Sequence, residues 1–109
     1  MSSDKYTYRV YYSEEDESFV ATCAEFPSIS WLEDSPSQAL VGLLAAVDEI
    51  LNDMKESNEP IPEPLTSAKY TGRITLRMPP DLHRRATIRA AEDNISLNRY
   101  ITDAVAKLG

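Results

Sequence analysis

Short runs of alternating apolar and polar residues occupy the first third of the chain. Tyr6 to Tyr12, Phe19 to Ala24 and Ile29 to Glu33 have the length and the residue types of strands. The acidic run at residues 13–18 is too polar and too like-charged for regular structure, so it predicts a hairpin turn between the first two strands. Pro27 is expected to end the second strand. The pattern predicts a small three-stranded antiparallel sheet.

After Ser35 the pattern changes to a helical period. Ser35, Pro36 and Gln38 supply an N-cap serine, a proline at the first helical position and a glutamine three residues after the cap. Beyond them, apolar residues recur at three- and four-residue spacing, namely Leu40, Leu43, Leu44, Val47, Ile50, Leu51 and Met54. We expect this stripe to form the core against the sheet.

Three prolines at alternate positions, Pro60, Pro62 and Pro64, follow the helix and prevent its continuation. The balance of charge changes just beyond them. Two independent signals thus indicate one boundary, and we expect an α/β domain at residues 1–58, a proline-rich linker at 59–69 and a second domain at 70–109.

The second domain begins with another alternation. In a strand at 72–78, Arg73, Thr75 and Arg77 would occupy one face and Ile74, Leu76 and Met78 the other. Pro79, Pro80 and Asp81 predict the start of a helix, and Asn94 predicts its left-handed end. Ser96 is expected to cap a last helix whose apolar face holds Leu97, Tyr100, Ile101, Ala104, Val105 and Leu108.

One strand and two short helices cannot bury their own apolar face or satisfy the edges of the strand. Two copies can do both if their strands pair antiparallel. The predicted fold class is therefore α+β, with an intertwined dimer at the C-terminus. Its expected core consists of Ile74, Leu76, Met78, Leu97, Tyr100 and Ile101.

Charge divides the chain at the same boundary. Residues 1–66 hold three Lys or Arg and fourteen Asp or Glu, a net charge of −11, whereas residues 67–109 hold eight and four, a net charge of +4. The acidic part would repel a phosphate backbone and suits a basic protein partner. The basic part suits DNA, because Arg forks onto guanine edges and Thr contacts bases in the major groove.

The C-terminal residues resemble a known family. Arg-Ile-Thr-Leu-Arg-Met-Pro at 73–79, followed by Asp-Leu-His-Arg-Arg-Ala and Asn-Ile-Ser-Leu-Asn-Arg-Tyr-Ile, is similar to the ribbon-helix-helix DNA-binding proteins. The resemblance covers roughly residues 70–109. It implies that Arg73, Thr75 and Arg77 contact bases, and that the backbone amides of Ser96, Leu97 and Asn98 hold a DNA phosphate. Asn94 stands where many relatives carry glycine.

The whole chain also resembles the HicB antitoxins. The resemblance rests on the Tyr-rich strand, the acidic turn, Phe-Val-Ala-Thr-Cys-Ala-Glu-Phe-Pro at 19–27, Ser-Pro-Ser-Gln-Ala-Leu at 35–40 and the proline-rich end of the helix. A common family glycine is replaced by the Ser28 to Ser30 segment. The resemblance implies a partly degraded RNase H-like domain that binds and covers a small basic HicA-type RNA-cleaving toxin. It also implies a C-terminal dimer that represses its own operon by binding operator DNA. A second self-contact through the N-terminal domains could give a tetramer.

Two other functions remain open from the sequence. The chain could be a free-standing regulator with a ligand- or protein-sensing first domain, or a metal-dependent RNase H-like nuclease. The acids offer no clear metal site, because Glu14 to Glu17 lie in the expected turn and Asp48, Glu49, Asp53 and Glu56 follow helical spacing. We therefore expect no enzyme activity, no cofactor and no metal.

The remaining features favour an ordinary cytoplasmic protein. Cys23 has no second cysteine or nearby histidine and is expected to be a buried, inert thiol. His83 is expected on the surface beside Arg84 and Arg85. No apolar stretch approaches the length of a membrane span, and the N-terminal residues lack the apolar core of a signal peptide.

Overall fold

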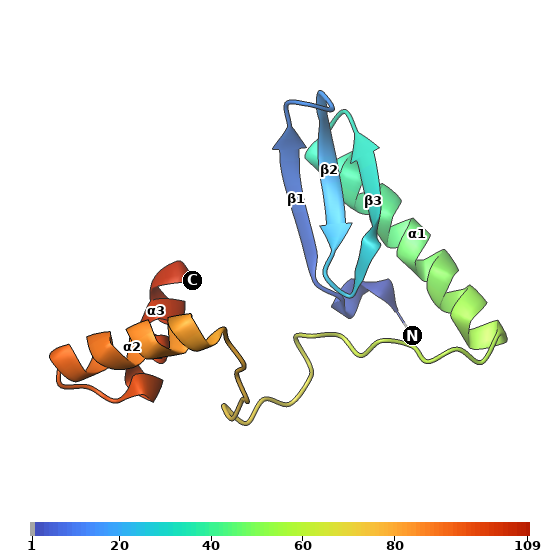
Figure 1. The fold of residues 1–109 in the computed structure, drawn as a ribbon. Coiled ribbons are helices and arrows are strands. Elements are labelled where there is room, and N and C mark those ends of the chain that lie inside the picture. The colour runs from blue at the N-terminus through green and yellow to red at the C-terminus, as the bar shows by residue number, and fades with distance from the viewer. Residues whose placement is uncertain (1) are drawn as a thin grey trace. The chain divides into compact units, whose positions relative to one another are not determined.

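The computed structural model describes residues 2–109 and contains two compact units, of which the first ends at Tyr70 and the second spans Thr71–Gly109. The described residues form an α+β chain with a three-stranded antiparallel sheet and three α-helices (Figure 1). No helix within residues 2–109 is long and apolar enough to cross a membrane. The elements are a short 3-10 helix Ser3–Lys5, β1 Tyr8–Ser13, β2 Ser18–Cys23, β3 Phe26–Glu33, α1 Pro36–Glu56, α2 Pro80–Glu92 and α3 Leu97–Leu108.

The sheet has the strand order β1-β2-β3, so β2 is central and each outer strand pairs with it alone. The first two strands meet in the predicted acidic turn, which closes after the Ser13–Ser18 pair. Within the turn, the Ser13 hydroxyl contacts the Asp16 carboxylate at 3.0 Å, and Glu17 adopts a positive φ of 50°. The hairpin prediction is confirmed.

The prediction that Pro27 ends the second strand is wrong. β2 already ends at Cys23, and Ala24 and Glu25 form the turn, so that Cys23 pairs with Phe26. Pro27 lies inside β3, which begins three residues earlier than Ile29. A proline is tolerated there because β3 is an edge strand, whose outward backbone amides need no partner in the sheet.

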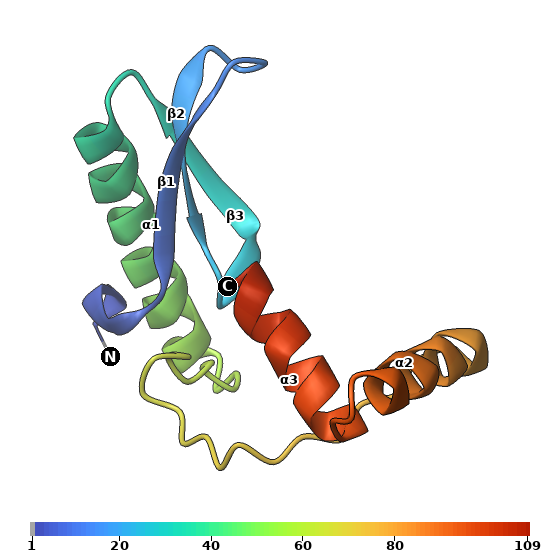
Figure 2. The same ribbon diagram turned by 90° about the vertical axis from the view of Figure 1, so that its left-hand side faces the viewer.

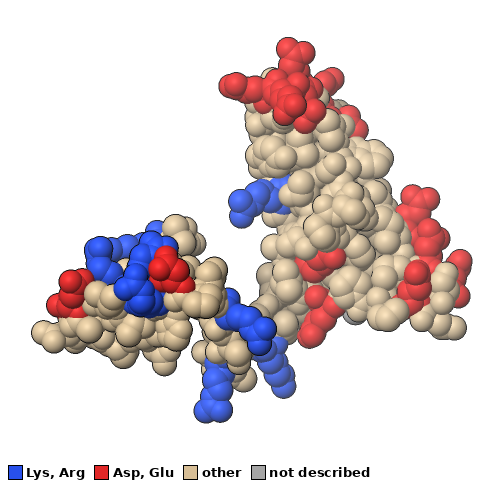
Figure 3. Space-filling model, viewed as in Figure 1, with Lys and Arg blue, Asp and Glu red and all other residues tan. Residues whose placement is uncertain are grey.

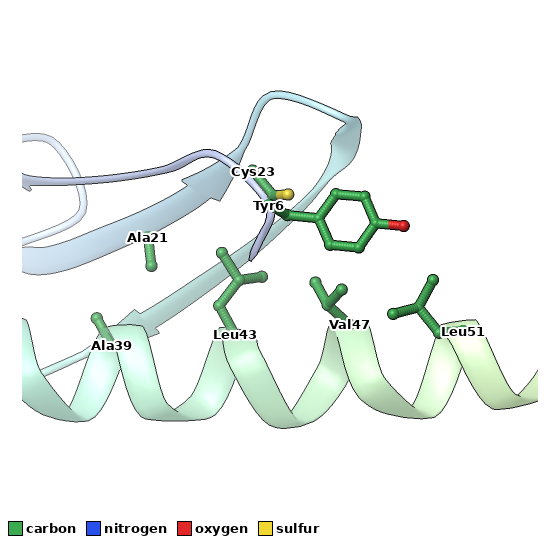
Figure 4. Close-up of a cluster of buried hydrophobic side chains, with 7 residues drawn as sticks. All are labelled: Tyr6, Ala21, Cys23, Ala39, Leu43, Val47 and Leu51. Carbon is green, nitrogen blue, oxygen red and sulfur yellow. The ribbon is translucent and has the colours of Figure 1, made fainter. Parts of the chain in front are cut away.

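Helix α1 packs along one face of the sheet and forms the core with it (Figures 2 and 4). The core residues are Tyr6, Ala21, Cys23, Ala39, Leu43, Val47 and Leu51. Four of them recur every fourth residue along α1, because that spacing keeps side chains on one face of a helix. Leu43, Val47 and Leu51 belong to the predicted stripe, whereas Leu40, Leu44, Ile50 and Met54 are only half-buried beside it.

Two further sequence expectations for this unit hold. The Ser35 hydroxyl accepts a hydrogen bond from the Gln38 amide at 3.2 Å, as an N-cap does. Cys23 is a free thiol with 1% exposure, and burial raises its pKa. A buried, protonated thiol is a poor nucleophile, as predicted.

Trp31 lies against α1 at Gly42. Trp31 is 39% exposed, and its indole Nε1 donates to a Glu33 carboxylate oxygen at 2.9 Å. A Cβ placed on Gly42 would collide with the indole ring. The glycine therefore lets the only tryptophan of the chain approach the helix closely, at a position where any side chain would push it away.

The proline-rich segment after α1 is hydrogen-bonded to the rest of the first unit. Asn58 ends α1 with φ 55°, and the Glu59 amide returns to the Met54 carbonyl at 2.9 Å. The Tyr6 hydroxyl donates to the Pro62 carbonyl at 2.6 Å, and Pro64 is buried. These contacts hold part of the segment expected to be a linker against the core.

Glu25 connects three parts of the first unit. Its carboxylate accepts hydrogen bonds from the Thr7 amide at 2.9 Å, the Thr7 hydroxyl at 3.0 Å and the Leu65 amide at 2.8 Å. Burial acts to raise the pKa of Glu25, but the amides of Leu65 and Thr7 outweigh it and lower the pKa to about 2. The ionised carboxylate thus stabilises the junction of the β2–β3 turn, the residue before β1 and the proline-rich segment.

We predict that Glu25→Gln lowers the free energy of unfolding by about 1–3 kcal/mol at neutral pH, because an amide replaces a carboxylate that accepts hydrogen bonds from Thr7 and Leu65. Since the folded pKa of Glu25 is depressed, its stabilisation is complete above the unfolded pKa and disappears as the pH falls towards 2. The difference between variant and parent should therefore shrink in acid. Urea unfolding from pH 7 to pH 2 measures it.

The matched control for this prediction is Glu63→Gln, which removes an exposed carboxylate from the same proline-rich segment. It should leave the unfolding midpoint within experimental error of the parent. A Glu25→Gln variant as stable as the parent at pH 7 would show that the three hydrogen bonds contribute nothing net.

Candidate nucleic-acid interface

Residues 72–78 form no strand within the described chain, although their sequence alternates as a strand does. Arg73, Thr75 and Arg77 are all exposed. A strand forms its backbone hydrogen bonds with a neighbouring strand, and none lies beside this segment within residues 2–109. The strand stays a prediction about two paired copies.

The apolar side of the same segment is also uncovered. Ile74 is 82% exposed and Leu76 is 54% exposed, while Met78 is half-buried. All three line a groove of about 670 Å³ together with Leu97 and Ile101 of α3. Five of the six residues predicted to form a dimer core therefore surround one groove in the second unit.

Tyr100, the sixth predicted core residue, is half-buried and lines a different groove of about 320 Å³. That groove also contains Leu82 and Ile88 of α2, which are 42% and 45% exposed. The Tyr100 side chain thus faces α2, while Leu97 and Ile101 face the segment at 72–78.

The junction of the two helices follows the sequence prediction. Asn94 has φ 55°, and the Ile95 amide returns to the Ala90 carbonyl at 3.0 Å, which closes the end of α2. The Ser96 hydroxyl then accepts from the Arg99 amide at 3.0 Å and caps α3. Leu97 and Asn98 follow in the first turn, where helix geometry leaves backbone amides without a carbonyl partner inside the helix.

The arginines of this unit fall into two groups. Arg84 and Arg85 contact Asp81 at 3.6 and 3.3 Å, and further ion pairs join Arg89 to Glu92 at 4.0 Å and Arg99 to Asp103 at 3.7 Å. Within the part of the chain that the structure describes, Arg73 and Arg77 form no ion pair. Their guanidinium groups are available to an external anion or base.

The sequence did not predict the turn that Thr71 and Gly72 form at the start of the segment. Gly72 has φ 83°, a conformation that other residues rarely adopt, and the Thr71 hydroxyl accepts a hydrogen bond from the Arg73 amide at 3.2 Å. Together they turn the chain into the segment that carries the arginines. A glycine after a hydroxyl residue is the signal that could have indicated this turn.

The second unit buries very little apolar surface by itself. Ala86 and Ala90 are its only buried residues among those described. Its exposed large apolar residues are Ile74, Leu76, Leu82, Ile88, Val105 and Leu108. A unit of about forty residues lies near the lower size limit at which a chain folds on its own apolar burial.

Acidic side chains gather on the first unit and basic ones on the second (Figure 3). The residues of the β1–β2 turn, Glu14 to Glu17, are all exposed, as is Asp48, whose carboxylate accepts from the Ser3 amide at 3.0 Å. Among residues 2–109, no three His, Cys, Asp or Glu side chains are grouped so that they could hold a metal ion. His83 is exposed on α2, as predicted.

Similarity to known proteins falls mainly on the second unit. The model of the HicB family matches residues 56–105, from the last residue of α1 through most of α3. No curated protein and no solved structure is detectably similar to the chain. The match covers slightly less than half of the chain and shows similarity to the HicB family over that segment.

Proposed function

We propose that this chain is an antitoxin that neutralises a small basic RNA-cleaving toxin of the HicA type through its first unit, and represses its own operon through its second. The match to the HicB family suggests the antitoxin role. The separation of charge supports the division of labour, because residues 1–66, of net charge −11, favour a basic partner and residues 67–109, of net charge +4, favour DNA.

The DNA-binding half of the proposal rests on residues 72–78, where apolar and basic side chains are both exposed. The segment exposes Ile74 and Leu76 as well as Arg73 and Arg77, and the two arginines form no ion pair within residues 2–109. In a strand, their alternation would place the apolar and the basic side chains on opposite faces. Pairing with the same segment of a second chain would bury the apolar side and satisfy the strand edges at once. The arginines and Thr75 would then stand on a two-stranded ribbon, which fits the major groove.

The last helix supplies a second contact in this proposal. The amides at Ser96, Leu97 and Asn98 lie where the dipole of α3 favours a negative charge. A DNA phosphate bound there would fix the position of the ribbon over the bases without reading them.

For the dimer, we predict that Ile74→Asp abolishes self-association of the full chain at micromolar concentration, because it places a charge in the shared core. Analytical ultracentrifugation over a range of concentrations measures the effect. Val41→Asp is the matched control, because Val41 is 65% exposed on α1 and should leave association unchanged. Retention of a full dimer by Ile74→Asp would exclude strand pairing through this segment.

For the DNA interface, we predict that Arg73→Ala and Arg77→Ala each weaken operator binding by about 1–3 kcal/mol and relax sequence preference. Titrations against operator and scrambled duplexes measure both effects. Arg89→Ala removes an arginine that pairs with Glu92, so it should weaken binding less and equally for both duplexes. Parent-like operator binding by both variants would refute the ribbon assignment.

For the antitoxin role, we predict that a gene adjacent to this one encodes a short basic protein that inhibits growth when expressed alone. Co-expression with the full chain should restore growth and yield a stable complex by size-exclusion chromatography. The double variant Arg73→Ala, Arg77→Ala should still restore growth, because its first unit is intact. The absence of such a neighbour, or of a complex with it, would dispose of the antitoxin role.

A further inference from the structure

The face of the sheet opposite α1 carries an apolar row. Tyr11 pairs with Val20, and Val20 pairs with Leu32, so the three side chains lie side by side across all three strands. Val20 is only 4% exposed, yet it does not belong to the core cluster beneath α1. Tyr11 and Leu32 flank it on that face.

Those neighbours are themselves uncovered. Tyr11 is 48% exposed and Leu32 is 45% exposed, and within the first unit α1 lies on the other face of the sheet (Figures 1 and 2). The next row along the strands is polar and consists of Arg9, Thr22 and Ser30. The apolar row is thus a compact patch with a polar border.

The opposite border of the patch is acidic. Ser13 pairs with Ser18 two residues beyond the apolar row, and the strands then enter the exposed turn Glu14 to Glu17. Figure 3 shows these acids gathered at the tip of the first unit. An apolar centre beside a charged rim is the usual anatomy of a protein–protein interface. Among the paired strand residues on this face, Arg9 alone is a cation, and it lies on the side away from the acidic turn.

We infer that this face is the surface through which the first unit binds its basic protein partner, with Tyr11, Val20 and Leu32 at the centre and the acidic turn at the rim. The inference rests on the proposed antitoxin function and assigns its toxin-binding site. A second copy of the chain is a poorer occupant, because it would bring together two acidic turns and two copies of residues 1–66, each of net charge −11.

The test uses the full chain and the basic protein encoded beside its gene, in surface plasmon resonance at fixed ionic strength. The double variant Tyr11→Ser, Leu32→Ser should weaken binding at least tenfold, mainly through faster dissociation, because both residues are central anchors. Val41→Ser removes a more exposed apolar side chain from α1 and should change affinity less than twofold. Operator binding should be unchanged in both.

A second variant tests the rim without touching the sheet. Glu14→Gln with Glu15→Gln changes only exposed side chains of the turn, so it should leave the unfolding midpoint unchanged. We expect slower association and a weaker dependence of the association rate on salt, because these carboxylates would steer a basic partner.

The possible results distinguish an error in the assigned face from a failure of the proposed antitoxin function. If the parent binds the basic protein but both variants bind it equally well, the assigned face is wrong and the antitoxin function stands. If the double variant keeps its affinity for the basic protein but loses self-association, the face belongs to a second copy and the inference is overturned. If the parent forms no complex at all, the proposed function fails together with the inference.

Discussion

The backbone of residues 72–78 has no neighbouring strand within the described chain, and most of what is distinctive about the second unit follows from that constraint. An extended segment carries amides and carbonyls that need partners, and here it also carries apolar side chains that line an open groove. Helices α2 and α3 bury only two alanines between them within the described residues. In the proposed dimer a single pairing event would supply the hydrogen bonds, the core and the DNA-reading surface together.

The first unit, in contrast, pairs its strands and forms its core within one chain. Its sheet and α1 share a continuous core, and the chain that leaves α1 is held back against that core by Tyr6 and Glu25. The unit therefore has a hydrophobic core of its own, which no second copy is needed to complete. The proposed toxin-neutralising and DNA-binding roles thus differ in how far each depends on self-association.

Much of this architecture could be predicted from local sequence signals. Ser35, Ser96 and Asn94 act at short range through their own side chains or backbone angles, and each occupies the predicted cap or stop. The period of α1 identified three of its four buried residues, because spacing alone decides which residues share a helix face. The charge division and the alternation at 72–78 likewise needed no knowledge of tertiary contacts.

The features that escaped prediction depend on residues far apart in the chain. Nothing around Glu25 indicates that it accepts a hydrogen bond from Leu65, forty residues later. The tolerance of Pro27 within β3 depends on that strand lying at an edge, which is a property of the whole sheet. The place of Val20 between Tyr11 and Leu32 depends on the register of two strand pairs, and sequence alternation alone leaves that register open.

The close approach of Trp31 to Gly42 has a practical consequence for spectroscopy. The chain has one tryptophan, and its indole lies between β3 and α1, so its fluorescence reports the packing of the first unit and is silent on the second. Emission spectra and far-ultraviolet circular dichroism therefore observe different parts of the molecule. Denaturation followed by both signals would resolve whether the two units lose structure as one cooperative system or as two.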